Sequence, residues 1–223
     1  MIFISKTLYD NSLGIALVLM LFFAAYFLVA KVPDKRIFAN YLRSRRLMAG
    51  ALLMLSANYS VHLLIAPRFL WQEAAIMMNL ATYSFTYWLF SCAFIVLLNR
   101  YYLTWKRFLT HLLVSLLYAA LSFIILFCVP AGTVQHTCMA AMALWLIVYG
   151  FFLSRRVILT YRWAVRLFDD THSEDIAAYI RWMSIFTWWA LIFGVGCGLL
   201  TFLPDRYVFL WILSSIPFYI YLY

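Results

Sequence analysis

The chain has 223 residues, of which 67% are hydrophobic and 11% are charged, and its mean hydropathy is +0.93. Soluble domains carry about 25% charged residues, so this composition excludes an independent soluble fold and predicts an all-α integral membrane protein. The net charge of +9 does not predict nucleic-acid binding by these residues, because basic residues flanking membrane spans are retained on the cytoplasmic side.

Seven apolar segments follow one another along the chain. At about 1.5 Å per residue, segments of this length can cross about 30 Å of hydrocarbon as α-helices. We therefore predict a seven-transmembrane-helix bundle that forms a single membrane domain over residues 1–223. The spans are expected at 11–30, 47–66, 74–98, 108–129, 138–154, 182–203 and 207–223.

Lys and Arg are unevenly distributed over the connections between these spans. The segments 31–46, 99–107 and 155–181 carry six, three and five of them, whereas the N-terminus and the segments around Arg68 and Arg206 carry one each. Positive charge marks cytoplasmic connections, so we expect the N-terminus outside and the C-terminus on the cytoplasmic side of the membrane. The last span ends without a basic anchor, which predicts that a cytoplasmic effector domain follows residue 223.

The segment 155–181 is the longest basic connection, and it predicts a cytoplasmic helical elbow. Its first part, SRRVILTYRWAVRLF, is expected to extend the fifth span beyond the bilayer, with two aspartates closing that helix. Thr171 and Glu174 have the spacing of a capping box, in which each side chain accepts from the other residue's backbone N–H. A second helix is therefore expected to start at Thr171 and to pass through Arg181 into the sixth span.

Two spans carry polar residues along one helical face. Asn58 and His62 are four residues apart in the second span, and Asn79, Tyr83 and Tyr87 have the same spacing in the third. Because the two spans run antiparallel, both stripes fall at similar depths in the outer half of the membrane. Two further candidates in the fourth span are Tyr118 and Ser122.

Two interpretations of these polar residues compete. The favoured one is hydrogen bonding between helices, which contributes about 0.6 and up to about 2 kcal/mol per contact. The other is a small-molecule pocket that opens outward, lined by aromatic side chains with a few converging polar groups. His62 finds no second histidine at its level, so we predict neither a metal ion nor a cofactor.

The sixth span contains a face of small residues. Ala190, Gly194 and Gly198 recur at intervals of four, and such residues let two helix backbones approach closely. We favour packing within the bundle over the alternative, which is a homodimer.

The four cysteines show no CxxC spacing, which is the pattern typical of zinc or thiol redox sites. Cys92, Cys128, Cys138 and Cys197 are therefore interpreted as packing residues. Cys128 and Cys138 fall near the same end of neighbouring spans, so a disulfide in an oxidising compartment stays open as an alternative.

Features of enzymes and ion-coupled transporters are missing from the sequence. No Asp, Glu, Lys or Arg lies well inside a predicted span, whereas proton-coupled pumps and voltage sensors need such a group. There is also no HExxH motif and no Gly-rich phosphate loop in a suitable context. We therefore expect no enzymatic activity.

The C-terminal quarter resembles a known family. The acidic capped segment, YIRWMSIF, FLPDRY and WILSSIPFYIYLY together resemble the membrane domains of Bacteroidetes-type AraC-like transcription regulators, most clearly over 168–223. The resemblance implies a bacterial membrane sensor or anchor domain that passes an outer or intramembrane signal to a cytoplasmic helix-turn-helix module.

No helix-turn-helix segment lies within residues 1–223, so any contact with DNA would be made through a domain beyond them. The alternatives to a sensor are a stand-alone carrier or channel for a small solute, and a structural membrane subunit.

Overall fold

The computed structural model describes residues 2–31 and 39–170, together with eight isolated positions between 185 and 213. The last two predicted spans lie outside these continuous ranges. So do seven of the candidate residues named above, namely Thr171, Glu174, Arg181, Ala190, Gly194, Cys197 and Gly198.

The two continuous ranges are helical and contain no strand. Of the six helices in these ranges, five are long and apolar enough to cross a membrane, which confirms the first five predicted spans as apolar helices. The remaining helix is a single turn between the second and third of the long ones. The helices are α1 (Ile2–Val29), α2 (Ala39–Ile65), α3 (Pro67–Leu70), α4 (Gln72–Leu98), α5 (Trp105–Cys128) and α6 (Thr133–Asp169).

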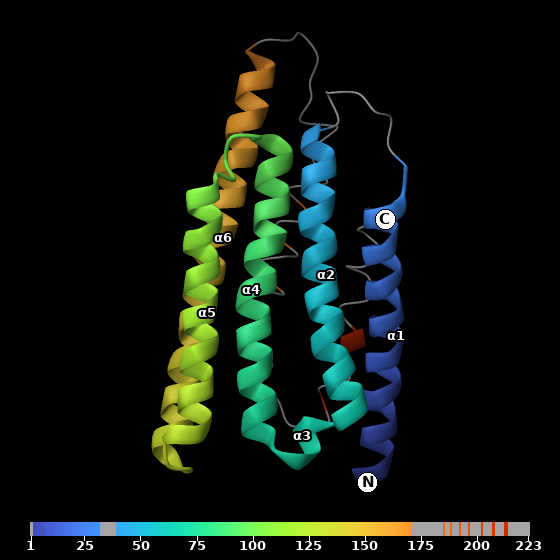
Figure 1. The fold of residues 1–223 in the computed structure, drawn as a ribbon, viewed down its shortest axis with the longest axis vertical. Helices are drawn as coiled ribbons and strands as arrows, with labels where there is room; N and C mark the ends of the chain where they lie inside the picture. The colour runs from blue at the N-terminus through green and yellow to red at the C-terminus, as the bar shows by residue number, and fades with distance from the viewer. Residues whose placement is uncertain are drawn as a thin grey trace.

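The five long helices stand side by side and alternate in direction along the chain (Figure 1). Helix α4 is central and packs on α2, α5 and α6, whereas α1 packs on α2 at one edge. Because of this alternation, the residues 39–46, 99–107 and 155–166 gather at one end of the bundle. We call this the basic end, since these segments carry most of the Lys and Arg residues of three connections.

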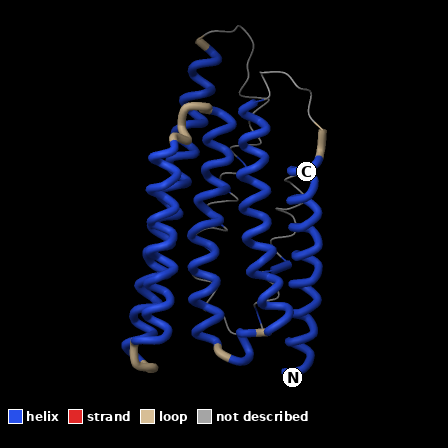
Figure 2. The backbone as a smooth tube through the Cα atoms, viewed as in Figure 1, coloured by secondary structure: helices blue, strands red, loops and turns tan. Residues whose placement is uncertain are grey.

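At the basic end the helices are longer than the apolar runs that predicted them. Helix α2 begins at Ala39 rather than at residue 47, and α6 continues to Asp169. With 37 residues, α6 is about 55 Å long at 1.5 Å per residue, and its C-terminal end extends beyond the neighbouring helices (Figure 2). Long basic side chains keep their charge in water while their stems cover apolar surface, so a helix can continue through the headgroup layer.

A tight turn joins α2 to α4 at the opposite end of the bundle. Ala66 adopts a left-handed conformation with φ of 50°, which ends α2, and Pro67 then opens the single turn of α3. Proline suits the first helical position because its fixed φ is helical and its missing N–H would have no partner there. The reversal places the C-terminal half of α2 beside the N-terminal half of α4.

The core consists of two apolar clusters that meet on α4. The first includes Leu13, Leu52 and Trp88 of α1, α2 and α4 and extends to Leu153 and Val157 of α6. In it, small residues such as Ala16 and Ala51 are fully buried, and they allow close approach of the helix backbones. The second cluster lies between α4, α5 and α6, where methionines and leucines predominate.

One arginine is buried where α1 ends. The Arg45 side chain is only 5% exposed, and its guanidinium donates to the backbone oxygens of Tyr26 at 2.9 Å and Ala30 at 3.0 Å. The last carbonyls of a helix lack partners within the helix and carry partial negative charge. Arg45 therefore ties the start of α2 to the end of α1.

Candidate functional site

Polar side chains from three helices form a connected network near the α3 end of the bundle. The Tyr9 hydroxyl of α1 lies 3.0 Å from His62 Nδ1 of α2, and His62 Nε2 lies 2.8 Å from Asn79 Oδ1 of α4. Asn58 Nδ2 donates to the same Asn79 oxygen at 2.9 Å, and the Thr82 hydroxyl is 3.4 Å from Asn58 Oδ1. We call these five residues the polar network.

The helical spacing explains how the network assembles. Asn58 and His62 lie one turn apart on α2, and Asn79 and Thr82 are three residues apart on α4, so each pair shares a face. The two faces meet because the turn at Ala66 makes α2 and α4 antiparallel neighbours at this depth.

The hydrogen-bond partners assign the protonation of His62. Asn79 Oδ1 is an acceptor, so His62 Nε2 carries the proton and donates it. His62 Nδ1 can then accept from the Tyr9 hydroxyl, which makes a neutral imidazole consistent with both partners. This tautomer follows from the network geometry, with the Asn79 amide oriented to accept from Asn58.

The network is closed to solvent. Exposure is 3% for Tyr9, 4% for Asn58, 2% for His62 and 8% for Asn79. These side chains bond directly to one another and fill the interface, as expected for polar residues that hold membrane helices together. Ligand binding at these residues stays a prediction, and it would require them to separate.

The other candidates of the third span point elsewhere. Tyr83 packs against both apolar clusters, and Tyr87 bonds through its hydroxyl to Ser154 of α6. The Tyr87 contact links α4 to α6. The stripe predicted on this span is therefore divided between two interfaces.

Tyr118 and Ser122 lie at a third interface, the one between α5 and α6. The Tyr118 hydroxyl donates to the Met142 backbone oxygen at 2.9 Å, and Ser122 donates to the Tyr118 backbone oxygen one turn back in its own helix. The rings of Tyr118 and Trp145 lie 4.8 Å apart between their centroids.

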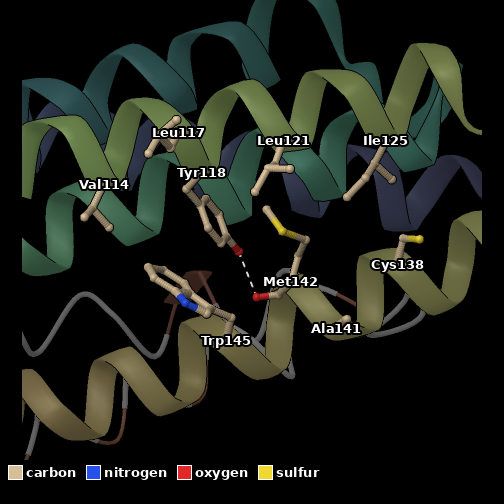
Figure 3. A pocket seen from close by; sticks show the side chains of 9 residues that line it. All are labelled: Val114, Leu117, Tyr118, Leu121, Ile125, Cys138, Ala141, Met142 and Trp145. Atoms are coloured by element: carbon tan, nitrogen blue, oxygen red, sulfur yellow. Dashed lines mark hydrogen bonds between the residues drawn. The ribbon is translucent and has the colours of Figure 1, made fainter.

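An apolar groove of about 420 Å³ runs along this α5–α6 interface. Figure 3 shows Tyr118 and Trp145 reaching into it from opposite helices, with the Tyr118 to Met142 hydrogen bond across it. Ligand sites commonly have volumes of about 300–1,000 Å³, so the groove could hold a small apolar molecule. We call it the α5–α6 groove. The residues lining it are Val114, Leu117, Tyr118, Leu121, Ile125, Cys138, Ala141, Met142 and Trp145.

Sequence reasoning missed three participants in these contacts. Tyr9 lies in a polar stretch before the first apolar run, so hydropathy gives no reason to place it against His62. Thr82 shares a helix face with Asn79, and this spacing could have indicated it. Ser154 lies at the end of the predicted fifth span, and nothing in its spacing indicates Tyr87 as a partner.

The thiols and possible metal ligands are dispersed in the described ranges. Cys92, Cys128 and Cys138 are free thiols, with no disulfide between the last two, and Cys197 lies outside the described residues. Within 2–31 and 39–170, no group of three or more His, Cys, Asp or Glu side chains is arranged to hold a metal ion. His136 and Glu73 come within 4.0 Å as a partly exposed pair.

Over residues 2–31 and 39–170 the chain is all-helical, with five helices able to cross a membrane, as in multi-pass membrane proteins. Within the described residues, a buried hydrogen-bonded network of side chains links α1, α2 and α4. No protein-family model, curated protein or solved structure matches the chain.

Proposed function

We propose that this chain is the membrane domain of a signalling or transcription regulator in the bacterial inner membrane. It has seven transmembrane helices with the N-terminus outside, and it holds an output module on the cytoplasmic side. The resemblance of residues 168–223 to AraC-like regulators supports this proposal, and so does the excess of Lys and Arg at one end of the bundle.

The observation that carries the proposal is the extension of α6 at the basic end. The helix runs about 55 Å, well beyond the roughly 30 Å of hydrocarbon, and it carries Arg155, Arg156, Arg162 and Arg166 along the extension. A rigid helix that continues from the bilayer into the cytosol is a suitable element for passing movement to a downstream module.

Transmission requires two arrangements of the helices whose balance a signal changes. The α5–α6 groove supplies a place where a small apolar ligand could act, because filling it would change how α6 sits against α5. The Tyr87–Ser154 contact would pass this change to α4. The polar network then serves as the fixed side of the bundle.

A paired substitution in the groove tests this function. Ala141 lines the groove, whereas its neighbour Ala140 is also exposed on α6 but does not line it. We expect Ala141→Leu in the full-length protein to mimic an occupied groove and change the transcript profile of the native cell, while Ala140→Leu leaves it unchanged. Equal membrane abundance of the two variants serves as the control. Identical transcript profiles for both variants and the unaltered protein would contradict a sensory role.

A second candidate is a stand-alone carrier or channel for a small apolar or weakly polar solute, favoured by the volume of the same groove. Liposomes that contain only these 223 residues distinguish it, since a carrier gives solute flux and a sensor domain does not. A structural subunit would show neither flux nor a transcript response.

A further inference from the structure

Three arginines from three helices converge on one connection at the basic end. Arg43 of α2 donates to the Leu103 backbone oxygen at 2.9 Å, and Arg107 of α5 donates to the Tyr102 backbone oxygen at 2.9 Å. The guanidinium carbons of Arg107 and of Arg156 from α6 lie 5.1 and 5.7 Å from the centroid of the Tyr102 ring. We call Arg43, Arg107 and Arg156 the arginine cluster.

The cluster has no acidic counterpart nearby in the described residues. Between residues 39 and 168 the one acidic residue is Glu73, in the first turn of α4 at the opposite end of the bundle. Asp170 follows Arg156 by 14 residues, or about 20 Å along the helix. Burial raises the pKa of the Tyr102 phenol, against the opposing charges of Arg156 and Arg107, so Tyr102 supplies no negative charge at neutral pH.

Most of the hydrogen-bonding capacity of the cluster is unused by the described residues. A guanidinium has five N–H donors, and Arg43 and Arg107 each give one nitrogen to a backbone carbonyl. Arg156 lies beside the Tyr102 and Phe152 rings with no hydrogen bond to a described residue. All three side chains are exposed. The backbone contacts thus hold the Arg43 and Arg107 guanidinium groups in place, and ring contacts hold that of Arg156, while further donors stay available.

Unused guanidinium donors in a group of like charges favour an anion with several oxygens. Phosphate oxygens accept paired N–H bonds from arginine, which makes arginine the preferred residue for phosphate recognition. Trp105, which is 71% exposed and adjacent in sequence to Lys106 and Arg107, is the kind of residue found at headgroup level. A cluster beside such a residue would lie at the level of lipid phosphates.

We propose that the arginine cluster is a binding site for a phosphate ester, supplied either by the headgroup of an anionic phospholipid or by a soluble phosphate compound. The phosphate would sit between α2, α5 and α6 and join the three helices at the basic end. Basic pockets between helices at this level commonly take such headgroups.

A pair of triple variants with equal loss of charge tests the site. Each control residue is exposed and lies on the same helix as its counterpart, without a described contact to Tyr102 or Leu103. The cluster variant combines Arg43→Gln, Arg107→Gln and Arg156→Gln, and the control variant combines Arg46→Gln, Lys106→Gln and Arg155→Gln.

The full chain is purified in neutral detergent and titrated with phosphatidylglycerol, with phosphatidylcholine as the neutral reference, and bound lipid is measured by native mass spectrometry. We expect phosphatidylglycerol to bind the unaltered protein in preference to phosphatidylcholine. The cluster variant should bind phosphatidylglycerol about tenfold more weakly, a loss of roughly 1.4 kcal/mol, with a change of less than about twofold in the control variant.

A second arm identifies the source of the phosphate. The protein in phosphatidylcholine nanodiscs is titrated with inorganic phosphate. Saturable binding that the cluster variant loses supports a soluble ligand, whereas binding of phosphatidylglycerol without inorganic phosphate supports a lipid headgroup.

Equal weakening in both triple variants, or equal binding of the two lipids, would overturn the proposal. So would the absence of measurable binding of both phosphatidylglycerol and inorganic phosphate to the unaltered protein.

If the cluster variant fails to fold, Arg156→Gln is compared with Arg155→Gln, because neither side chain makes a hydrogen bond to a described residue. Weaker binding in the first alone supports the site, and equal binding contradicts it.

Discussion

The interface between α2 and α4 differs sharply from the interface between α5 and α6. The first is filled by side chains that hydrogen-bond across it and by alanines that bring the helices close. The second leaves a groove of about 420 Å³ and has the Tyr118 to Met142 hydrogen bond across it. In lipid, apolar burial alone does not drive helices together, so polar contacts and close packing determine which pairs are fixed. We therefore expect the α2–α4 side to be the rigid part of the bundle and the α5–α6 side to be the adaptable part.

The largest expected effect comes from adding volume to each interface. Ala51 is fully buried among α1, α2 and α4, whereas Ala141 lines the groove. Because overpacking a tight core is costly, Ala51→Leu should lower the free energy of unfolding by about 3 kcal/mol and Ala141→Leu by less than about 0.5 kcal/mol. Unfolding in mixed micelles, followed by circular dichroism during titration with a denaturing detergent, measures both. Equal losses of unfolding free energy at the two positions would contradict the distinction between a rigid and an adaptable side.

The next effect comes from removing the acceptor shared within the polar network. Asn79→Leu leaves Asn58 Nδ2 and His62 Nε2 without their common partner. We expect a loss of about 2 kcal/mol, measured in the same unfolding assay. Ser84→Ala is the matched control on α4, since Ser84 is buried but bonds within its own helix. A loss no greater than that of the control would show that the network contributes little.

A smaller effect should appear as coupling between α1 and α2. Tyr9→Phe removes the hydroxyl that meets His62 and keeps the ring, whose centroid is 5.6 Å from that of Phe69. A double-mutant cycle with His62→Leu should give an interaction energy of about 1 kcal/mol. Strict additivity of the two substitutions would mean that this hydrogen bond does not couple the helices.

The smallest effect is expected on the adaptable side. Tyr118→Phe removes the hydrogen bond to Met142 but retains the ring beside Trp145. Its cost should be about 0.6 kcal/mol or less in the unfolding assay. A loss above that of Asn79→Leu would reverse the assignment of rigid and adaptable sides.

Hydropathy predicted the five long helices well, because runs of apolar residues of this length have few alternatives in a bilayer. Hydropathy did not predict where these helices end at the basic end of the bundle. Helix α2 begins eight residues before the apolar run, and the reason is that basic side chains with long stems let a helix continue through the headgroups.

The polar residues show where one-dimensional spacing stops being informative. The spacing predicts His62 at the depth of Asn79 and Asn58 at the depth of Tyr83. In the structure both His62 and Asn58 bond to Asn79. Tyr87 lies eight residues after Asn79, which is about 80° around the helix at 3.6 residues per turn, and it reaches α6 instead. Tyr118 lies on α5, which packs on α4 and α6. Which helices become neighbours depends on packing and is not encoded in the period of a single helix.

The most direct test is where the two ends of the helix bundle lie relative to the membrane. In a background without native cysteines, Tyr101→Cys probes the basic end and Ala131→Cys probes the turn between α5 and α6, and both positions are exposed. An impermeant maleimide should label Ala131→Cys from the outside of right-side-out spheroplasts, and Tyr101→Cys only after permeabilisation. Labelling of both from outside, or of Tyr101→Cys alone, would contradict the threading of these helices through the membrane.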